Sequence, residues 1–400
     1  MNILVVHETE YLAKDKMVFE YQIIPEIWAN KGHQVFVLDY PTHWRKKHFF
    51  DFGYARSQII RNIRRSSQKK GITLIRPAIV KVPGLARIVA VVSYFFLIPK
   101  IIRKYKIERI FLYSVPTNGL QTIFWARRFK VPVHFRLLDV LHRLVPNKFL
   151  SSPTYLLEKI VYPRVSELTA ITPRLTKYAI SMGANKRTAS YLPSASDSEL
   201  FYPQRKDPKL LRKFLIKRGE LTLLFAGTLY GFSGLDRIIE FWGKHKDEFL
   251  NLKLIVCGDG SQKKLLEKLI EKYALGDQIF LTGFINYLKL PKYINLADIC
   301  INPFEINEIT KIIFPGKIYQ YMACGKPTIA TRLKGVLDIF PDLGGKNGIY
   351  YFSLSRPREF FELAHKIGRR EIKDPNPQLN EIAGIIEKRL LQLKVKSEKW

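Results

Sequence analysis

Cysteine is scarce in this sequence, and the cysteines present are not spaced as pairs. The 400 residues contain three, Cys257, Cys300 and Cys324, with no CxxC spacing. This pattern does not favour a disulfide scaffold or a metal site built on paired cysteines. We expect three reduced cysteines in the core of an intracellular protein.

The sequence also lacks a secretory signal and an apolar run long enough to cross a bilayer. The first ten residues, MNILVVHETE, have no charged leader and no small-residue cleavage site, so we expect a strand there. The most apolar run, residues 84–100, has Arg87 near one end and Pro99 at the other. About a dozen apolar residues remain, too few for a spanning helix. We therefore expect a buried helix and a cytoplasmic protein.

Acidic residues are under-represented. The chain has 66 lysines and arginines against 35 aspartates and glutamates, a net charge of +31. The excess is concentrated in residues 41–150, which hold 23 basic residues and 3 acidic ones. A field of this size attracts phosphates, anionic lipid or nucleic acid. The alternative is a generally basic protein with solvated lysines.

The remaining composition is that of a globular protein, with 47% hydrophobic and 25% charged residues, and the length suits two domains. Apolar strand patterns alternate with helical ones, which predicts parallel sheets covered on both faces, an α/β class. In the first half, strands are expected at residues 2–7, 31–40, 109–114, 131–139 and 167–172.

The pattern restarts after a linker rich in Pro, Ser and Asp near residues 192–210. New strands are expected at residues 221–227, 252–260, 278–283 and 299–304. We predict two Rossmann-like domains, 1–192 and 193–380. An amphipathic helix over 381–400 is expected to follow and to pack back on the first domain.

Three strands of the second domain end in glycine: Gly227, Gly258 and Gly283. Ligands of parallel sheets bind beyond the carboxyl ends of the strands, and glycine lets the backbone approach them closely. The segment Gly258-Asp259-Gly260 is equally compatible with a simple tight turn. The three ends together indicate a ligand site.

Lys317 lies in the first turn of a helix predicted from Pro315 to Gly325. A cation at that position is unfavourable for the helix dipole, so an anion is expected to offset it, and phosphate is the natural candidate. Gln320 lies one turn further on the same face and could bond a polyol. A surface lysine and a solvated glutamine are the alternative.

These residues carry a resemblance to a known family. The segments LFAGTLYGFSGLDRIIEF, LIVCGDG, IFLTGFINYLKLPKYINLADICINPF and PGKIYQYMACGKPTIAT, within residues 221–335, resemble group 1 retaining glycosyltransferases of the GT-B fold. The linker segment LPSASDSELFYP resembles the family's linker. In the first half the resemblance is otherwise one of topology, apart from ELTAITPRLTKYAISMGA.

The resemblance implies a nucleotide-sugar donor, UDP- or GDP-linked, and transfer with retention of configuration and no metal ion. It implies that Lys317 binds the diphosphate, that Phe284 lies where the base is held, and that Gln320 contacts the ribose. The other residues assigned to donor binding are Gly227, Thr228, Ser233, Gly258 and Gly283.

The sequence departs from the family at several positions. Ile312 and Gln320 replace a pair of glutamates, so Glu305 or Glu308 would have to supply a carboxylate to the donor sugar. Thr228 and Ser233 replace two phosphate-binding cations. We expect Lys311 and Arg332 to be helpers of Lys317.

The first domain is expected to hold the acceptor, an anionic or lipid-linked glycan. His134 and Asp139 are its candidate catalytic residues, because we expect them to flank the end of a strand. The basic, aromatic-rich segment 44–70 is expected to contact an anionic membrane surface, peripherally and from the cytoplasm.

Three other functions remain open. The same basic segment would suit a nucleic-acid-binding protein, but no known binding motif is present and no nucleic acid is expected. A sugar-nucleotide epimerase would need a stronger set of carboxylates. An inactive nucleotide-sugar-binding partner protein would explain Ile312 and Gln320.

Overall fold

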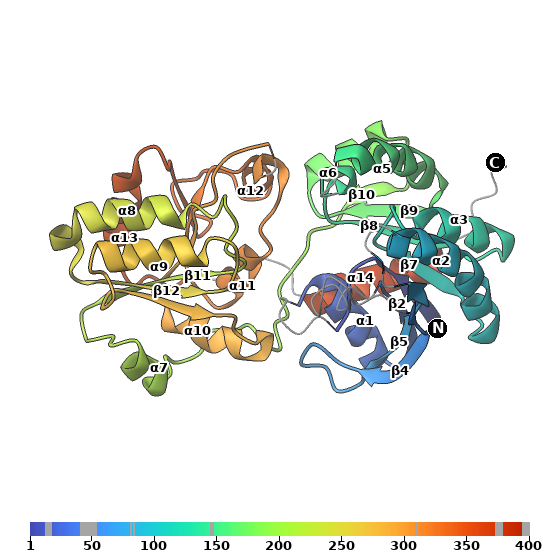
Figure 1. Cartoon of the computed structure of the whole chain (residues 1–400), viewed down its shortest axis with the longest axis horizontal. Coiled ribbons are helices and arrows are strands. Elements are labelled where there is room, and N and C mark those ends of the chain that lie inside the picture. The colour runs from blue at the N-terminus through green and yellow to red at the C-terminus, as the bar shows by residue number, and fades with distance from the viewer. Residues whose placement is uncertain are drawn as a thin grey trace. The chain divides into compact units, whose positions relative to one another are not determined.

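The computed structural model describes residues 1–12, 18–40, 54–80, 82, 85–144, 148–308, 310–372 and 379–393. The chain forms two compact units, unit 1 with residues 1–193 and 379–400, and unit 2 with residues 194–378. Each unit is built on its own largely parallel sheet with helices on both faces (Figure 1). The predicted pair of α/β domains is confirmed.

Unit 1 has an eight-stranded sheet in the order β10-β9-β8-β7-β1-β2-β5-β4. The strands are β1 (Asn2–Val6), β2 (Gln34–Leu38), β4 (Gln58–Ile63), β5 (Ile72–Arg76), β7 (Arg109–Leu112), β8 (Val133–Leu137), β9 (Glu167–Ala170) and β10 (Ala189–Tyr191). A separate pair is formed by β3 (Tyr54–Ala55) and β6 (Ile79–Val80). All pairs of the large sheet are parallel except β4 with β5.

The helices of unit 1 are α1 (Glu20–Asn30), α2 (Leu85–Lys104), α3 (Gly119–Arg128), α4 (Leu141–Leu144), α5 (Lys148–Val161), α6 (Pro173–Ser181) and α14 (Leu379–Gln392). The last of these returns from the end of the chain and packs on α1. The indole of Trp28 donates to Ala383 O at 3.0 Å, and Glu387 accepts from Lys31 at 2.8 Å. The predicted terminal helix therefore belongs to unit 1.

Unit 2 has a six-stranded, all-parallel sheet in the order β13-β12-β11-β14-β15-β16. The strands are β11 (Leu221–Ala226), β12 (Leu252–Cys257), β13 (Ile279–Gly283), β14 (Ile299–Asn302), β15 (Thr328–Thr331) and β16 (Ile349–Phe352). The helices are α7 (Pro208–Lys213), α8 (Leu235–Lys244), α9 (Lys263–Lys272), α10 (Leu290–Leu296), α11 (Lys317–Ala323), α12 (Lys334–Leu337) and α13 (Pro357–Ile367). Every residue of β11 and β12 is buried, because helices cover both faces of the sheet.

Unit 1 differs from the sequence-based prediction in several features, among them strands β5 and β10 and the β3–β6 pair, which were not predicted. Residues 44–53 of the basic segment 44–70 lie outside the described residues. The rest of the segment contains the edge strand β4, which is antiparallel to β5. The helix expected to be buried over 84–100 continues through Pro99 to Lys104, and that expectation is wrong for one of its faces. Among the described residues, α2 is long and apolar enough to cross a membrane by length and composition. Its most apolar 18-residue window has a mean hydropathy of 2.0, and 39% of that window is buried.

Candidate active site

The first two glycine-ended strands of unit 2 bring their loops into direct contact. A Cβ on Gly258 would lie 1.9 Å from Gly227 O, and one on Gly260 would lie 2.5 Å from Leu229 O. The loops are joined by hydrogen bonds from Gly227 N to Cys257 O at 2.9 Å and from Leu229 N to Asp259 O at 3.0 Å. The two glycines after β12 are therefore needed for the two loops to pack against each other. The segment Gly258-Asp259-Gly260 is thus a packing contact between loops as well as a tight turn.

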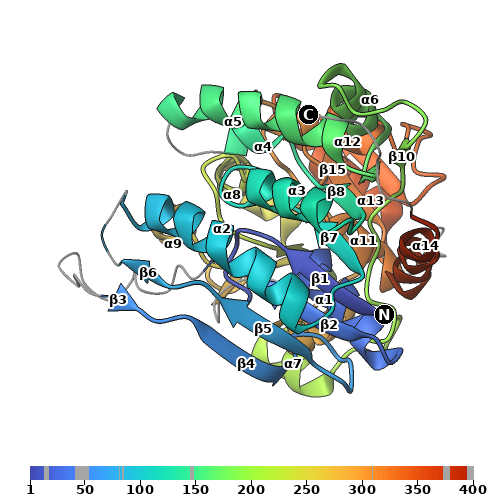
Figure 2. The same cartoon turned by 90° about the vertical axis from the view of Figure 1, so that its right-hand side faces the viewer.

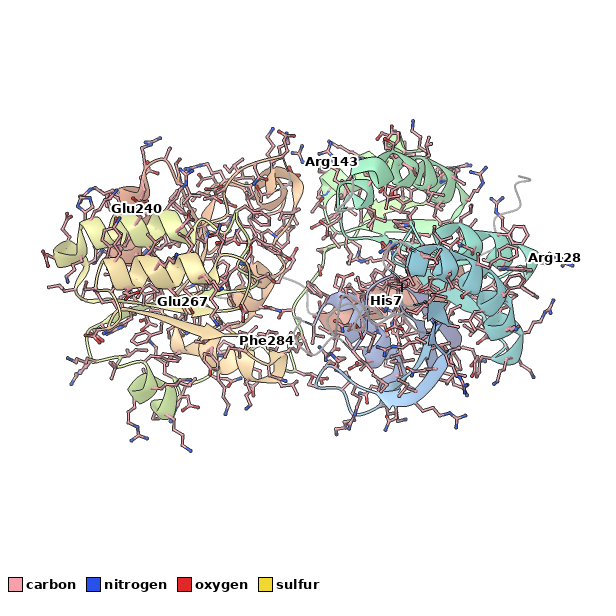
Figure 3. All side chains as sticks on the ribbon, in the orientation of Figure 1. His7, Arg128, Arg143, Glu240, Glu267 and Phe284 are labelled. Atoms are coloured by element: carbon pink, nitrogen blue, oxygen red, sulfur yellow. The ribbon has the colours of Figure 1, made fainter. Side chains whose placement is uncertain are left out.

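Gly227 and Gly283 serve the site differently. Gly227 has φ +145°, and a Cβ there would lie 3.0 Å from Lys317 Nζ. Gly283 has φ +71° and open space where its Cβ would be. The following Phe284, labelled in Figure 3, is 37% exposed. The end of β13 thus offers open backbone and an aromatic surface.

Alanine substitutions at Gly258 and at Gly283 should lower the free energy of unfolding by different amounts. Gly258→Ala should lower the free energy of unfolding by about 3 kcal/mol, because the methyl group meets backbone that must move. Gly283→Ala should cost only about 1 kcal/mol, from the left-handed backbone. Urea unfolding of both variants checks this, and equal losses would refute the packing role of Gly258.

Lys317 is the most unusual residue of unit 2. Its side chain is buried at the start of α11, with Nζ 3.6 Å from the ring centroid of Phe225 and 4.3 Å from that of Phe304. Among the described residues Nζ has no hydrogen-bond partner. Burial lowers the pKa of this ammonium well below its usual value. The rings stabilise a cation, but an unpaired buried charge remains costly, so the site is suited to an anion.

Further buried polar atoms without a partner in the described part of the chain lie on the segments around Lys317. They are Oε1 of Gln320, Oγ of Ser233 and both amide atoms of Asn302, the last residue of β14. The segments approach closely, since a Cβ on Gly234 would lie 1.9 Å from Pro303 O. Sequence reasoning missed Asn302. Its one signal was a polar residue at the end of an otherwise apolar strand.

The other candidates of unit 2 are already engaged or exposed. Glu305 binds Arg237 Nε at 2.9 Å and lines a pocket of about 560 Å³ with residues 353–356. The Glu308 carboxylate is 84% exposed and pairs with Lys311. Arg332 pairs with Asp342 at 3.1 Å. Thr228 is exposed, and the side chain of Ile312 lies outside the described residues.

Neither proposed helper cation is therefore free to assist Lys317 without giving up a carboxylate, and neither proposed carboxylate is unpaired.

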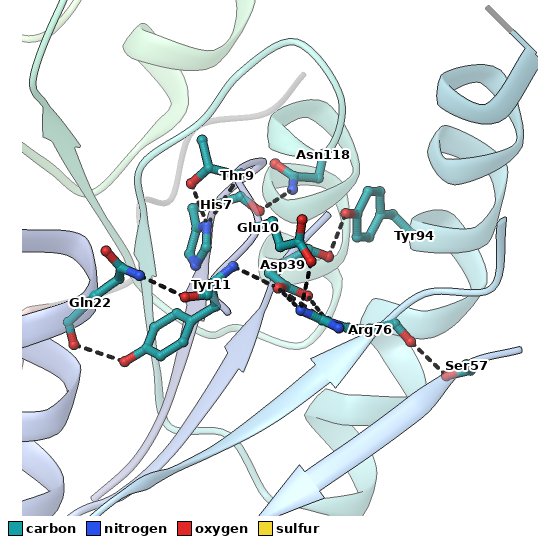
Figure 4. A network of polar contacts seen from close by, with 10 residues as sticks. All are labelled: His7, Thr9, Glu10, Tyr11, Gln22, Asp39, Ser57, Arg76, Tyr94 and Asn118. Atoms are coloured by element: carbon teal, nitrogen blue, oxygen red, sulfur yellow. Dashed lines mark hydrogen bonds and ion pairs between the residues drawn. The ribbon is translucent and has the colours of Figure 1, made fainter. Parts of the chain in front are cut away.

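In unit 1, a buried polar network holds the loop after β1 against β2 and β5 (Figure 4). Asp39 accepts from Tyr11 N at 2.9 Å and faces Arg76 at 3.4 Å. Tyr94 of α2 donates to Asp39 O at 2.8 Å. Burial raises the pKa of Asp39 to about 7 and lowers that of His7 to about 3. This network fixes the loop that follows β1 at the carboxyl edge of the sheet.

The two catalytic candidates of unit 1 lie at opposite ends of β8. His134 is the second residue of the strand and fully buried, with Nε2 2.8 Å from Thr169 Oγ1 and Nδ1 3.3 Å from Glu167 Oε2. Burial lowers the pKa of His134. This placement favours a structural role and corrects the expectation that His134 flanks the end of the strand.

Asp139 follows the carboxyl end of β8, at the edge where ligands of parallel sheets bind. It has no hydrogen bond or ion pair with the residues that the structure describes, and burial raises its pKa to about 7. Nearby, His142 is held by Glu158 at 2.8 Å. Asp139 is therefore the carboxyl group of unit 1 best placed to accept a proton near neutral pH.

Comparison with known proteins supports this assignment of the fold. Residues 206–359 match the family of glycosyl transferases group 1. The chain is 24% identical over 232 residues to the 2-deoxystreptamine glucosyltransferase of Streptomyces kanamyceticus, which covers 56% of each chain. It is 25% identical over 157 residues to the phosphatidylinositol N-acetylglucosaminyltransferase gpi3 subunit of Schizosaccharomyces pombe, covering 39% of this chain and 32% of that one. The alignments thus span about a third to a half of these relatives.

The fold has a close counterpart among solved structures. HepE of Anabaena, solved in complex with UDP-glucose, superposes with a TM-score of 0.69 at 14% identity, covering 98% of this chain and 100% of that one. Two Rossmann-like units with this topology are those of the GT-B class. The predicted resemblance to group 1 glycosyltransferases is confirmed for residues 206–359, and the predicted fold is confirmed for both units.

Proposed function

We propose that this protein transfers a sugar from a nucleotide-sugar donor to a glycan acceptor, with retention of configuration and without a metal ion. One observation carries the proposal: the ammonium of Lys317 is buried between Phe225 and Phe304 beside Gly227 and has no hydrogen-bond partner among the described residues. The diphosphate of the donor would supply the missing negative charge. Because that charge grows as the sugar leaves, a fixed buried cation stabilises the transition state more than the ground state.

The donor is proposed to be UDP- or GDP-linked. The relative HepE was solved with UDP-glucose, which favours a uridine nucleotide. The base would lie over Phe284 beyond Gly283, and the ribose hydroxyls would bond the free Oε1 of Gln320. Ser233 and Asn302 offer further hydrogen bonds to the phosphates or the sugar.

The acceptor is proposed to be a lipid-linked or other glycan held at the carboxyl edge of the unit 1 sheet. One relative is named for a phosphatidylinositol substrate and another for an aminocyclitol, so both kinds of acceptor occur among similar proteins. Asp139 would take the proton of the attacking hydroxyl. The protein would work in the cytoplasm, on an anionic membrane surface that attracts its basic unit 1 and segment 44–70.

The test is a donor panel of UDP-glucose, UDP-N-acetylglucosamine, UDP-galactose and GDP-mannose in EDTA. Each donor is mixed with phosphatidylinositol in mixed micelles or with 2-deoxystreptamine, and released nucleoside diphosphate is measured. We expect one donor to be consumed only with an acceptor, and proton NMR to show the donor's anomeric configuration in the product. Transfer that requires added metal, or inversion, would contradict the proposal.

A second candidate is an inactive protein that binds a nucleotide sugar for a partner. Gln320 stands where the family has a carboxylate, and Glu305 is held by Arg237. This candidate predicts that a nucleotide raises the melting temperature while no donor is turned over with any acceptor.

A further inference from the structure

One face of α2 is apolar and exposed. Ile88, Val92 and Phe96 are 62%, 52% and 60% exposed, and Leu85 and Phe95 lie on the same side. They recur every three or four residues, so they form a stripe along the helix. The opposite side of α2 is fully buried against unit 1. Helix α2 is apolar all round, but the protein covers one side of it and leaves the other exposed. The exposed apolar side therefore requires an explanation.

Helix α3 extends this stripe into a broader surface. Helices α2 and α3 lie side by side on the outside of unit 1 (Figure 2). The ring of Phe124 on α3 lies 5.6 Å from that of Phe95, and the ring of Trp125 lies 5.3 Å from it. Between the helices is a groove of about 420 Å³, lined by Val91, Val92, Phe95, Phe96, Leu120, Gln121 and Phe124. We name Ile88, Val92, Phe95, Phe96 and Phe124 the α2–α3 face.

The amide nitrogen of the one polar residue that lines the groove bonds to the protein itself. Gln121 Nε2 donates to Val91 O and to Thr117 O, each at 3.1 Å. The rest of the groove's described lining is apolar, which suits a hydrocarbon or an apolar protein surface as its occupant.

Basic residues border the α2–α3 face. Helix α2 ends in Lys100, Arg103 and Lys104, which are exposed. Helix α3 ends in Arg127 and the exposed Arg128, which is labelled in Figure 3. Between residues 85 and 130 the sequence has a single carboxylate, Glu108, and it accepts a hydrogen bond from Asn2 N at 2.7 Å. The C-terminal ends of α2 and α3 lie side by side, since the Arg103 guanidinium is 5.0 Å from the ring centroid of Phe129, so these basic residues gather at one end of the apolar face. A basic end next to an apolar surface matches an anionic bilayer, whose phosphates border its hydrocarbon.

We propose that the α2–α3 face docks onto an anionic lipid bilayer, with its apolar side chains in the hydrocarbon and the basic helix ends at the phosphates. The helix lies in the interface and does not span it. Its buried side belongs to the unit 1 fold, where Tyr94 bonds Asp39 and Ala86, Ala90 and Ile98 are fully buried. The proposal stands apart from sugar transfer, since vesicle binding requires no donor.

The position of the stripe connects this surface with the acceptor edge of unit 1. The stripe begins at Leu85, and the neighbouring Arg87 bonds Glu8 at 3.3 Å and Thr117 at 2.8 Å, in the loops after β1 and β7. Both loops lie at the carboxyl edge of the sheet. A bilayer on the α2–α3 face would therefore bring lipid head groups near the edge assigned to the acceptor.

The test is sedimentation of the intact chain with vesicles of phosphatidylcholine plus phosphatidylglycerol, and with vesicles of phosphatidylcholine alone. Val92→Ser with Phe96→Ser removes apolar surface from exposed positions without opening the core. Leu250→Ser, in unit 2 and 64% exposed, is the matched control. Arg103→Gln with Arg128→Gln removes two positive charges beside the α2–α3 face. Thermal shifts with UDP are measured on every variant to check that the donor site is intact.

We expect wild type and Leu250→Ser to bind the anionic vesicles, and Val92→Ser with Phe96→Ser to bind at least about tenfold more weakly. The double arginine variant should bind more weakly at low salt and match wild type at high salt. Wild type remaining in the supernatant, or the serine variant binding normally, would overturn the proposal. So would loss of a wild-type dimer in the serine variant without vesicle binding, which would make the face a chain–chain interface.

Discussion

Lys317→Met is expected to weaken nucleoside diphosphate binding at least about a hundredfold and to raise the melting temperature of the unliganded protein. The Nζ of Lys317 is buried between Phe225 and Phe304 and has no partner in the part of the chain that the structure describes. When such a buried cation is removed from a binding site, the binding free energy of its anionic ligand falls by about 3 kcal/mol or more. Methionine keeps the volume and removes the charge, so the free protein no longer holds an unpaired ammonium.

The stability gain should depend on pH in a definite direction. Burial lowers the pKa of Lys317 in the folded state, so the folded chain binds this proton less tightly than the unfolded chain does. The folded state is therefore penalised as pH falls below the lysine's ordinary pKa, and the penalty is present at neutral pH. We expect Lys317→Met to stabilise the protein at about pH 7 and to have less effect at about pH 10.

Thermal unfolding with UDP, GDP, ADP and dTDP measures both effects, since a ligand at 100 times its dissociation constant adds about 2.7 kcal/mol. Lys311→Met is the control, because Lys311 is paired with Glu308 on the surface. If Lys317→Met keeps the full nucleotide-dependent shift, the lysine does not bind the diphosphate.

Asp139→Asn is expected to lower the rate of sugar transfer by about a hundredfold or more while leaving donor binding unchanged. Asp139 lies beyond the carboxyl end of β8, and burial raises its pKa to about 7. A base must be ionised to accept a proton, so wild-type activity should rise as pH increases through about 7. Loss of a general base costs about 10² to 10⁴ in rate.

The same variant should be more stable than wild type above pH 7. The folded state favours the neutral form of Asp139, so its contribution to stability is full below the ordinary carboxyl pKa and is lost as pH rises toward 7. Asparagine does not titrate, so the melting temperatures should differ at about pH 8 and converge at about pH 4.

Initial rates of nucleotide release across this pH range test the role of Asp139, with His134→Gln for comparison. Because His134 is buried between Glu167 and Thr169, its variant should mainly lower the melting temperature. An Asp139→Asn enzyme with the wild-type rate and pH profile would exclude Asp139 as the base.

The central strands of both sheets could be predicted from the sequence because they are buried on both faces, whereas β5, β10, β15 and β16 were not predicted. Runs such as residues 221–226 and 252–257 are continuously apolar, and both are observed strands. The edge strand β4 could not be recognised, because its burial pattern is mostly exposed and its register depends on β5. The exposed face of α2 was missed since hydropathy does not distinguish an apolar residue under a sheet from one left uncovered.

The candidate site was predictable where a residue contradicted its local surroundings. A lysine in the first turn of a helix signals an anion, and Lys317 lies in such a place, next to Gly227. Asn302 carries only the weak signal of a polar residue at the end of an apolar strand, and its amide becomes significant only when packing leaves it buried and without a partner among the described residues. His134 was misplaced because it lies within β8, and its partners Glu167 and Thr169 come from the neighbouring strand β9, which the sequence alone does not bring to it.

The measurement that tests the account most directly is a calorimetric titration of the intact wild-type chain with UDP, GDP, UDP-glucose and GDP-mannose, in EDTA. The account predicts that one nucleotide and its sugar conjugate bind at a single site per chain without metal. It also predicts that the diphosphate accounts for most of the affinity, so that uridine or guanosine alone binds far more weakly. Absence of binding by all four compounds, or binding that appears only with a divalent cation, would contradict a diphosphate site built on Lys317.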